Sequence, residues 1–350
     1  MKVFLKSIKP FLWTLFLLAA IPGCSKEDNL RSTVTPQTDT LAKGADISWL
    51  TEMEASGVKF YNSSGVEMDG IKLLKNLGMN AIRLRVWVNP EGGWNNAQDV
   101  LVKAMRAKDL NMRLMIDFHY SDTWADPGHQ TKPDAWKSLS FTGLKEAVSM
   151  HTKEVLNLMK QNGITPEWVQ VGNETNNGML WEDGKASVNM ANFAALIDAG
   201  YAAVKEVSPS SKVIVHLASG NDNSLYRWIF DGLKANGARW DVIGMSLYPE
   251  ADNWETMNTA CLANMNDMVS RYGKEVMICE VGMNVTAEDA AKNFLTDIIA
   301  KTRSVNGGKG LGVFYWEPES YNDWNGYKLG AFDSTGKPTS ALDAFQTTDK

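Results

Sequence analysis

The sequence predicts an α/β protein folded as a single (β/α)8 barrel, the TIM-barrel fold. Two observations favour it. From about residue 43, eight short apolar runs alternate with amphipathic stretches within a chain of 350 residues. No glycine-rich phosphate loop follows the first run, so an open doubly wound sheet is the less favoured alternative, and no internal repeat is evident.

The elements follow one another in regular order. The apolar runs predict strands at Gly44–Ser48, Ala81–Val88, Arg113–Phe118, Trp168–Val171, Lys212–Leu217, Val242–Ser246, Val276–Glu280 and Gly312–Trp316. The amphipathic stretches predict helices at Gly70–Leu77, Asn96–Lys108, Leu144–Gln161, Asn189–Val207, Leu225–Ala235, Trp254–Tyr272, Ala287–Ser304 and Pro338–Phe345. In such a barrel the chemistry gathers at the C-terminal ends of the strands.

The first 24 residues predict a bacterial lipoprotein signal peptide. Three lysines precede Phe11–Ile21, an apolar stretch too short to span a bilayer. The stretch ends at Ile21-Pro22-Gly23-Cys24, which resembles a lipobox, although Pro22 is unusual there and leaves an ordinary signal peptide as the alternative. Cleavage would leave Cys24 carrying the lipid, so that the protein is anchored to a membrane rather than spanning it.

The remaining chain divides into two parts. Residues 25–42 are polar and without periodicity, which predicts a flexible tether, and residues 43–350 form the barrel. We expect an exported, monomeric lipoprotein on the outer membrane. Cys261 and Cys279 are interpreted as core thiols, and Cys279 is expected to point away from the barrel mouth because Glu280 follows it on a strand.

Composition narrows the class of ligand. The net charge is -6 and the pI about 5.4, so no basic field attracts nucleic acid. Thirteen tryptophans are many, and their broad apolar faces suit stacking against sugar rings. The four histidines are widely spaced and form no metal-binding motif, so neither a metal nor an organic cofactor is expected. His151, on a predicted helix, is interpreted as a surface residue.

Polar and aromatic residues concentrate at the predicted strand ends. Alternation on the second strand places Arg83, Arg85 and Trp87 toward the barrel axis, where the cations need carboxylate partners. The third strand ends at His119, and the loop after it holds Trp124. Later strands end at His216, Tyr248 and Trp316. Trp49, Trp168, Trp228 and Trp240 lie on or beside elements and are interpreted as structural.

Two carboxylates at strand ends predict glycosidic bond hydrolysis. Glu174 follows the fourth strand and Glu280 ends the seventh, on opposite sides of the barrel, so they can converge across its mouth. One would protonate the leaving oxygen; at roughly 5–5.5 Å the other attacks directly, and a wider gap admits water. Arg83 is expected to keep Glu280 ionised, and desolvation to keep Glu174 neutral. Glu317 and Glu250 are weaker candidates for the nucleophile, and Glu167 lies at the wrong strand end.

Four segments resemble glycoside hydrolase family 53, the endo-β-1,4-galactanases acting on arabinogalactan side chains of pectin. They are Arg85–Pro90, Ser121–Pro127, Gly172–Glu174 and Tyr315–Pro318, and the resemblance runs from about Lys43 to Phe345. It implies Glu174 as acid/base and Glu280 as nucleophile. It further implies that Asn173 binds the sugar 2-hydroxyl, that Arg83 and Tyr248 orient Glu280, and that Trp316 floors the adjacent subsite. The cleft would be lined by Asp46, Trp87, His119, Trp124 and His216.

The sequence departs from the family pattern in three places. Val281-Gly282-Met283 follows Glu280 where the family usually has Thr and an aromatic residue. Asn284–Asn293 lacks the calcium loop of many bacterial members, so no calcium site is predicted, and the segment after Trp316 is short. Two other functions stay open: hydrolysis of another β-1,4-glycan such as mannan or cellulose, and non-catalytic glycan capture by a lipid-anchored protein.

Overall fold

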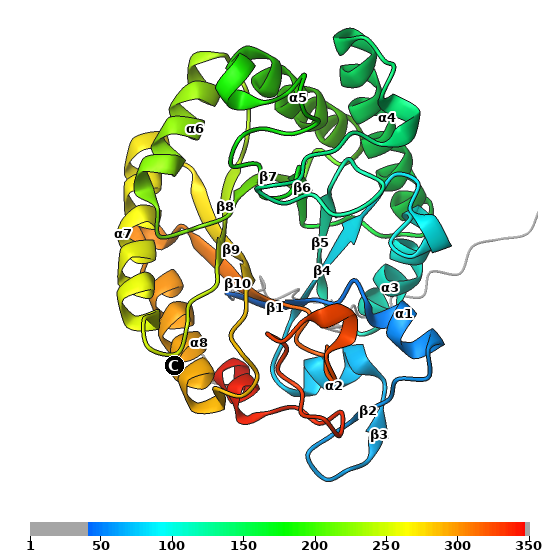
Figure 1. Cartoon of the computed structure of the whole chain (residues 1–350), viewed down its shortest axis with the longest axis vertical. Coiled ribbons are helices and arrows are strands. Elements are labelled where there is room, and N and C mark those ends of the chain that lie inside the picture. Colours follow the sequence, from blue (N-terminus) through cyan, green and yellow to red (C-terminus); the bar gives the residue numbers. More distant parts are fainter. Residues whose placement is uncertain (1–40, 347–350) are drawn as a thin grey trace, which may run out of the picture. The chain divides into compact units, whose positions relative to one another are not determined.

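The computed structural model describes residues 41–346 and forms a closed parallel barrel. Neighbouring strands follow the order β1-β10-β9-β8-β7-β6-β5-β4, and the helices surround them (Figure 1). The strands are β1 (Ala42–Asp46), β4 (Ala81–Val86), β5 (Arg113–Phe118), β6 (Trp168–Val171), β7 (Lys212–Leu217), β8 (Val242–Leu247), β9 (Glu275–Val281) and β10 (Gly310–Trp316). The predicted (β/α)8 barrel is therefore confirmed.

The helices alternate with the strands as predicted. They are α1 (Leu50–Ala55), α2 (Gly70–Asn76), α3 (Ala97–Asp109), α4 (Phe141–Gln161), α5 (Ala186–Val207), α6 (Asn223–Ala235), α7 (Trp254–Tyr272) and α8 (Glu288–Arg303). Several begin at side-chain caps: the Asn96 side chain, for example, accepts from the backbone N–H groups of Gln98 and Asp99. The predicted last helix is instead a 3-10 helix, Ser340–Gln346.

Two elements were not predicted. Helix α1 has only six residues, and the hairpin of β2 (Phe60–Tyr61) and β3 (Glu67–Met68) has two residues in each strand. Neither is long enough to give a periodic pattern. Shorter 3-10 turns lie at Glu91–Gly93, Asp134–Trp136, Asn306–Gly308 and Trp324–Gly326.

The N-terminal predictions largely lie outside the described residues, Cys24 among them. Strand β1 begins at Ala42, so the barrel includes the last residue of the segment predicted as tether. Within residues 41–346, no helix is both long and apolar enough to cross a membrane.

A plug of apolar side chains fills the barrel beneath its mouth. Each barrel strand contributes to it: Ala42, Ala81, Met115, Trp168, Ile214, Val242, Met277 and Cys279, and Phe314. A larger cluster lies between the strands and the helices. The filled interior closes the barrel from below, so polar side chains above it face only the mouth.

A β-bulge in β9 corrects the prediction for Cys279. Met245 pairs with Ile278, but the next residue, Ser246, pairs with Glu280, so Cys279 is an extra residue in the strand. Cys279 therefore packs inside the barrel and does not point to the opposite face from Glu280. Gly244 makes room for it, since a Cβ there would lie 2.8 Å from the Cys279 sulfur. Cys261 and Cys279 are both buried free thiols, as predicted.

The prediction of an exposed His151 is wrong. The residue lies on the inner face of α4 and is only 8% exposed. Its ring packs against Phe118, Tyr120 and Trp136 with centroids 5.6, 6.3 and 6.1 Å away. Burial lowers the pKa of His151 to about 4, so it is neutral and serves packing.

Candidate active site

A cleft of about 780 Å³ lies at the C-terminal ends of the strands. Its lining includes most of the predicted site residues: Trp87, His119, Trp124, Asn173, Glu174, Tyr248, Glu280 and Trp316. The two carboxylates therefore meet in one cavity. Asp46, Arg83 and His216 do not line it; all three are fully buried one layer below. The prediction that Asp46 and His216 line the cleft is wrong, because other polar side chains cover them.

Arg83 is the centre of that lower layer. Its guanidinium nitrogens lie 2.7 Å from an Asp46 oxygen, 2.8 Å from Asp117 and 2.8 Å from Glu280. It also donates to the side-chain oxygens of Gln170 and Asn173. These partners come from β1, β5, β6 and β9 and the turn after β6, so the predicted orientation of Arg83 toward the axis is confirmed. A buried cation is stable here because carboxylates surround it.

Asp117 and Gln170 were missed as site residues. Asp117 accepts from Arg83 and, at 2.5 Å, from the Gln170 amide. Both occupy inward positions near strand ends, and a buried polar residue at such a position was the available signal.

Glu280 is held by two donors on its two oxygens. Arg83 contacts Oε1, and the Tyr248 hydroxyl donates to Oε2 over 2.8 Å. Only 5% of the residue is exposed, which leaves the carboxylate reachable from the cleft alone. Both contacts stabilise the anion.

Glu174 has a different environment. The chain turns sharply after β6, with a positive φ of 83° at Gly172 and of 44° at Glu174. A Cβ at position 172 would lie 2.7 Å from the Thr175 methyl, so the turn requires glycine. The Glu174 carboxylate then receives one hydrogen bond, from the Ser246 hydroxyl at 2.6 Å. Ser246 in turn contacts His216 Nε2 at 2.8 Å.

The two carboxyls hold one proton between them near neutral pH. Burial raises the pKa of both carboxyls, that of Glu174 to about 7. Their direct contacts decide which of the two is ionised. Glu280 has an ion pair with Arg83 and a hydroxyl donor, whereas Glu174 has a hydroxyl alone. We assign the charge to Glu280 because an ion pair and a hydroxyl donor favour its ionised form more than one hydroxyl favours that of Glu174.

Aromatic rings form one wall of the cleft. Trp124 lies 5.2 Å from Trp87 and 5.8 Å from both Trp49 and Trp316, centroid to centroid, and Tyr327 lies 4.7 Å from Trp316. The rings meet edge to face, which holds each at a fixed angle. We call Trp49, Trp87, Trp124 and Trp316 the aromatic wall.

Trp49 corrects the prediction of a purely structural residue. It is only 4% exposed, yet it lines the cleft, and its backbone N–H donates to the Glu317 carboxyl. Trp168 and Trp240 are buried away from the mouth, and Trp228 is 44% exposed on α6. The cleft also takes in residues that the sequence analysis missed: Glu52, Glu91, Trp94, Asp126 and Tyr327.

The alternative nucleophiles lie elsewhere. Glu317 is fully buried behind the aromatic wall and pairs with Arg85 at 2.5 Å. Glu250 is exposed outside the cleft lining. Glu167 precedes β6 and pairs with Arg113, at the N-terminal end of the barrel. Of the four carboxylates considered as the nucleophile, only Glu280 lines the cleft with Glu174, and the Glu174 charge raises its pKa.

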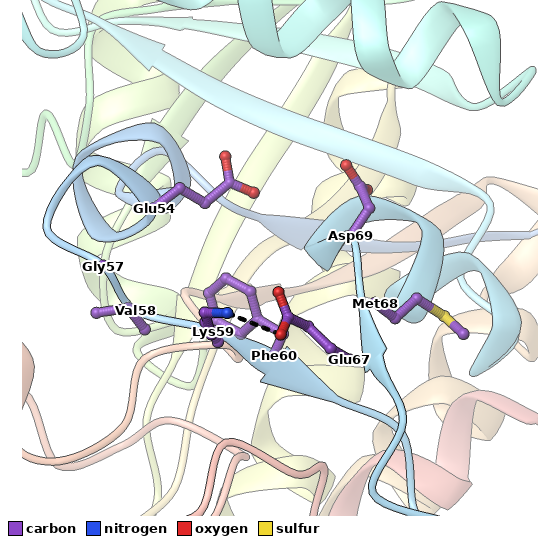
Figure 2. Close-up of a pocket in the computed structure, with 8 residues that line it drawn as sticks. All are labelled: Glu54, Gly57, Val58, Lys59, Phe60, Glu67, Met68 and Asp69. Atoms are coloured by element: carbon purple, nitrogen blue, oxygen red, sulfur yellow. Dashed lines mark hydrogen bonds and ion pairs between the residues drawn. The ribbon is translucent and has the colours of Figure 1, made fainter.

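A second hollow, of about 380 Å³, lies between α1 and the β2–β3 hairpin (Figure 2). Its carboxylates already have cationic partners: Arg106 pairs with Glu54 and Asp69, and Lys59 with Glu67. Among the residues that the structure describes, no group of His, Cys, Asp and Glu is arranged to hold a metal ion. The hollow thus offers ion pairs rather than reactive groups.

Known galactanases are similar to this chain in sequence and in fold. The chain is 35% identical over 298 residues to the probable arabinogalactan endo-beta-1,4-galactanase A of Neosartorya fischeri, covering 79% of this chain and 83% of that protein. It is 33% identical to the endo-beta-1,4-galactanase of Bacillus subtilis, covering 83% and 73%. A solved fungal beta-1,4-galactanase superposes with a TM-score of 0.82 at 30% identity, covering 88% of this chain and all of that one.

The family model for glycosyl hydrolase family 53 matches residues 42–345, from the first barrel strand to the last 3-10 helix. The match includes both cleft carboxyls and the buried layer beneath them, and with it this chain belongs to glycosyl hydrolase family 53.

Proposed function

We propose that this protein is an endo-acting, retaining hydrolase of β-1,4-galactan. The observation that carries the proposal is the pair Glu174 and Glu280 in one cleft, with a guanidinium on one carboxyl and not on the other. Relatives with at least 30% identity are named as endo-β-1,4-galactanases, which favours galactan as the substrate.

The reaction would proceed in two displacements. Glu174 gives its proton to the glycosidic oxygen while the Glu280 carboxylate attacks the anomeric carbon, forming a glycosyl ester and releasing the leaving sugar. Glu174, now ionised, takes a proton from water, and that water releases the glycosyl group with the original anomeric configuration. Arg83 and Tyr248 would hold Glu280 in line throughout.

Other residues of the cleft and of the layer beneath it are suited to bind the sugar. The Asn173 side chain is fixed by Arg83 and by its own bond to the Ala125 carbonyl, at 2.8 Å, and is suited to bind the sugar 2-hydroxyl. Trp316 would floor the sugar beside the bond, and Trp87, His119 and Trp124 would complete the wall. Two alternatives remain: another β-1,4-glycan as substrate, and glycan capture without catalysis.

Removal of each carboxyl tests the proposal. Glu174→Ala and Glu280→Ala should each lower reducing-sugar release from galactan by orders of magnitude. Azide should partly restore turnover of Glu280→Ala by forming a glycosyl azide of inverted configuration. Wild-type protein that binds galactan without cleaving it would favour capture, and cleavage of mannan or glucan in preference to galactan would change the substrate.

We further propose that the protein is a lipoprotein anchored through Cys24 to an envelope membrane. The proposal rests on the lysine-rich start and apolar stretch that precede this cysteine. Cys24→Ala should move the protein from the membrane to the soluble fraction of the producing cells, and unchanged partitioning would reject the anchor.

A further inference from the structure

Arg85 has no role in the reaction just described, although it is fully buried two residues after Arg83 on the same face of β4. Within the part of the chain that the structure describes, its one ion pair is with Glu317, 2.5 Å from Nη1. Nε and Nη2 have no hydrogen-bond partner among the described residues. A buried guanidinium with unpaired donors is costly, so other contacts must stabilise it.

Tryptophan rings supply those contacts. The central guanidinium carbon lies 4.4 Å from the Trp124 ring centroid, 5.2 Å from Trp87 and 5.3 Å from Trp49. Each distance is within the range of a cation–π interaction. These three rings belong to the aromatic wall and come from three separate strand-end segments, so Arg85 is their common contact.

A carboxyl layer lies behind Arg85. Glu317 accepts from Arg85 and also from the backbone N–H of Trp49, at 3.1 and 3.2 Å. Glu319 is fully buried, and neither of its oxygens has a hydrogen-bond partner among the described residues. Burial and the neighbouring Glu317 charge raise the pKa of Glu319 well above its usual value, so it is neutral, whereas the Arg85 cation counteracts the rise that burial causes in the pKa of Glu317.

We propose that Arg85, paired with Glu317, is the positioning residue of the aromatic wall: it holds Trp49, Trp87 and Trp124 in the orientation in which their rings receive the sugar chain. The inference rests on the proposed glycan substrate and deepens it by assigning a residue to sugar binding. Arg85 does not line the cleft and is not among the contacts of either catalytic carboxyl, so it acts through the tryptophans.

The proposal predicts a split between KM and kcat. Arg85→Met removes the cation, and KM for galactan should rise about tenfold because rings that are no longer held in one orientation must be ordered when the sugar binds. kcat should stay within about threefold, since the contacts of Glu174 and Glu280 are unchanged. Arg85→Lys keeps the charge but not the flat stacking surface, and should give an intermediate KM.

The matched control is Arg113→Met. Arg113 also stacks on a tryptophan, Trp168 at 4.5 Å, and pairs with a glutamate, Glu167, but at the opposite end of the barrel. Its substitution should leave KM unchanged. Arg85→Met leaves the buried Glu317 carboxylate without its cationic partner, which could prevent folding. The double variant Arg85→Met/Glu317→Gln removes both charges and can be measured if the single variant does not fold.

The outcomes separate this inference from the proposed function. Wild-type enzyme that fails to cleave galactan rejects the function. Active wild type, together with an Arg85→Met variant whose KM is unchanged or whose kcat alone falls, rejects the positioning role. An equal rise of KM in Arg113→Met rejects it as well, because the effect would then be general loosening of the barrel. A KM effect confined to the Arg85 variants supports it.

Discussion

Arg83 and Arg85 lie two residues apart on β4, point the same way and are both fully buried, yet they have different surroundings. Arg83 contacts three carboxylates and two amide oxygens, and one of those carboxylates is Glu280. Arg85 contacts one carboxylate and three indole rings. Two residues along one strand thus separate Arg83, which contacts the proposed nucleophile, from Arg85, which contacts the aromatic wall.

The difference follows from depth in the barrel. Asp46, Asp117 and Gln170, which surround Arg83, lie on strands or at strand ends, so Arg83 meets groups fixed by the sheet. Arg85 is nearer the mouth and meets side chains from the loops, where tryptophans replace carboxylates. The two arginines should therefore fail in different ways when they are changed.

Among the substitutions that compare the surroundings of the two arginines, Arg83→Lys has the largest expected effect. An ammonium is a point charge and cannot bridge Asp46, Asp117 and Glu280 as the forked guanidinium does. We expect kcat on galactan to fall about 100-fold, or roughly 2.7 kcal/mol, with little change in KM. Steady-state kinetics measures both parameters, and thermal unfolding checks that the variant is folded.

Arg85→Lys is the control for that substitution, because it makes the same change two residues further along β4, nearer the mouth. If both variants lose kcat alike, the two arginines serve one function. If Arg83→Lys lowers kcat and Arg85→Lys raises KM, they serve different functions.

A smaller effect is expected from Glu319→Gln, on the Arg85 side. The folded-state pKa of Glu319 is raised, so below its unfolded pKa of roughly 4.5 both states are protonated and the carboxyl costs nothing. As pH rises above that value, the unfolded state ionises first, and the wild type loses stability until the folded pKa is reached. The amide does not titrate, so the variant's advantage should grow with pH, reaching about 2–4 °C in Tm at pH 8.

Tm measured by calorimetry between pH 5 and 8 tests this. A difference that stays constant across the range would mean that Glu319 is not held neutral. The same variant should keep wild-type kcat, because no contact within residues 41–346 joins Glu319 to Glu174 or Glu280.

The sequence predicts the barrel well because its strands are apolar and its helices periodic, and three strands, β5 to β7, match their predicted bounds. It predicts poorly what depends on register or on distant contacts. The bulge that turns Cys279 inward requires the pairing of β9 with β8, which no local pattern encodes. Trp49 lies on the cleft wall, and its backbone N–H donates to Glu317, 268 residues away in the sequence, a contact that no local pattern encodes.

In the candidate site, too, some residues could be predicted from local sequence and others could not. Glu174 and Glu280 could be predicted because a carboxylate after a strand is a local signal, and both lie in the cleft. Whether Asp46 or His216 reaches the cleft depends on what lies above it, and Asn173 and Ser246 cover His216. Burial of one polar residue by another depends on tertiary contacts. The sequence therefore predicts correctly that Asp46 and His216 lie near the mouth, but not that they lie one layer below the cleft.

The smallest expected effect concerns Ser246, which joins Glu174 to the buried layer. Burial lowers the pKa of His216 well below its usual range, so its ring is neutral and carries one N–H. When Glu174 is ionised, the Ser246 hydroxyl donates to it over 2.6 Å and accepts from His216 Nε2. When Glu174 is protonated, the chain can reverse: Glu174 donates to Ser246, Ser246 to Nε2, and Nδ1 to the Asn173 oxygen at 3.0 Å.

These hydrogen bonds can form whether Glu174 is ionised or protonated. They change the pKa of Glu174 only to the extent that they stabilise one of the two forms more than the other. The Ser246 hydrogen bond lowers that pKa, so Ser246→Ala should raise it above about 7. The alkaline limb of the pH profile of kcat/KM, where Glu174 loses its proton, should therefore move to higher pH, and the acidic limb, set by Glu280, should stay. A shift of the acidic limb instead would exchange the roles of the two carboxyls, because the serine would then act on the nucleophile.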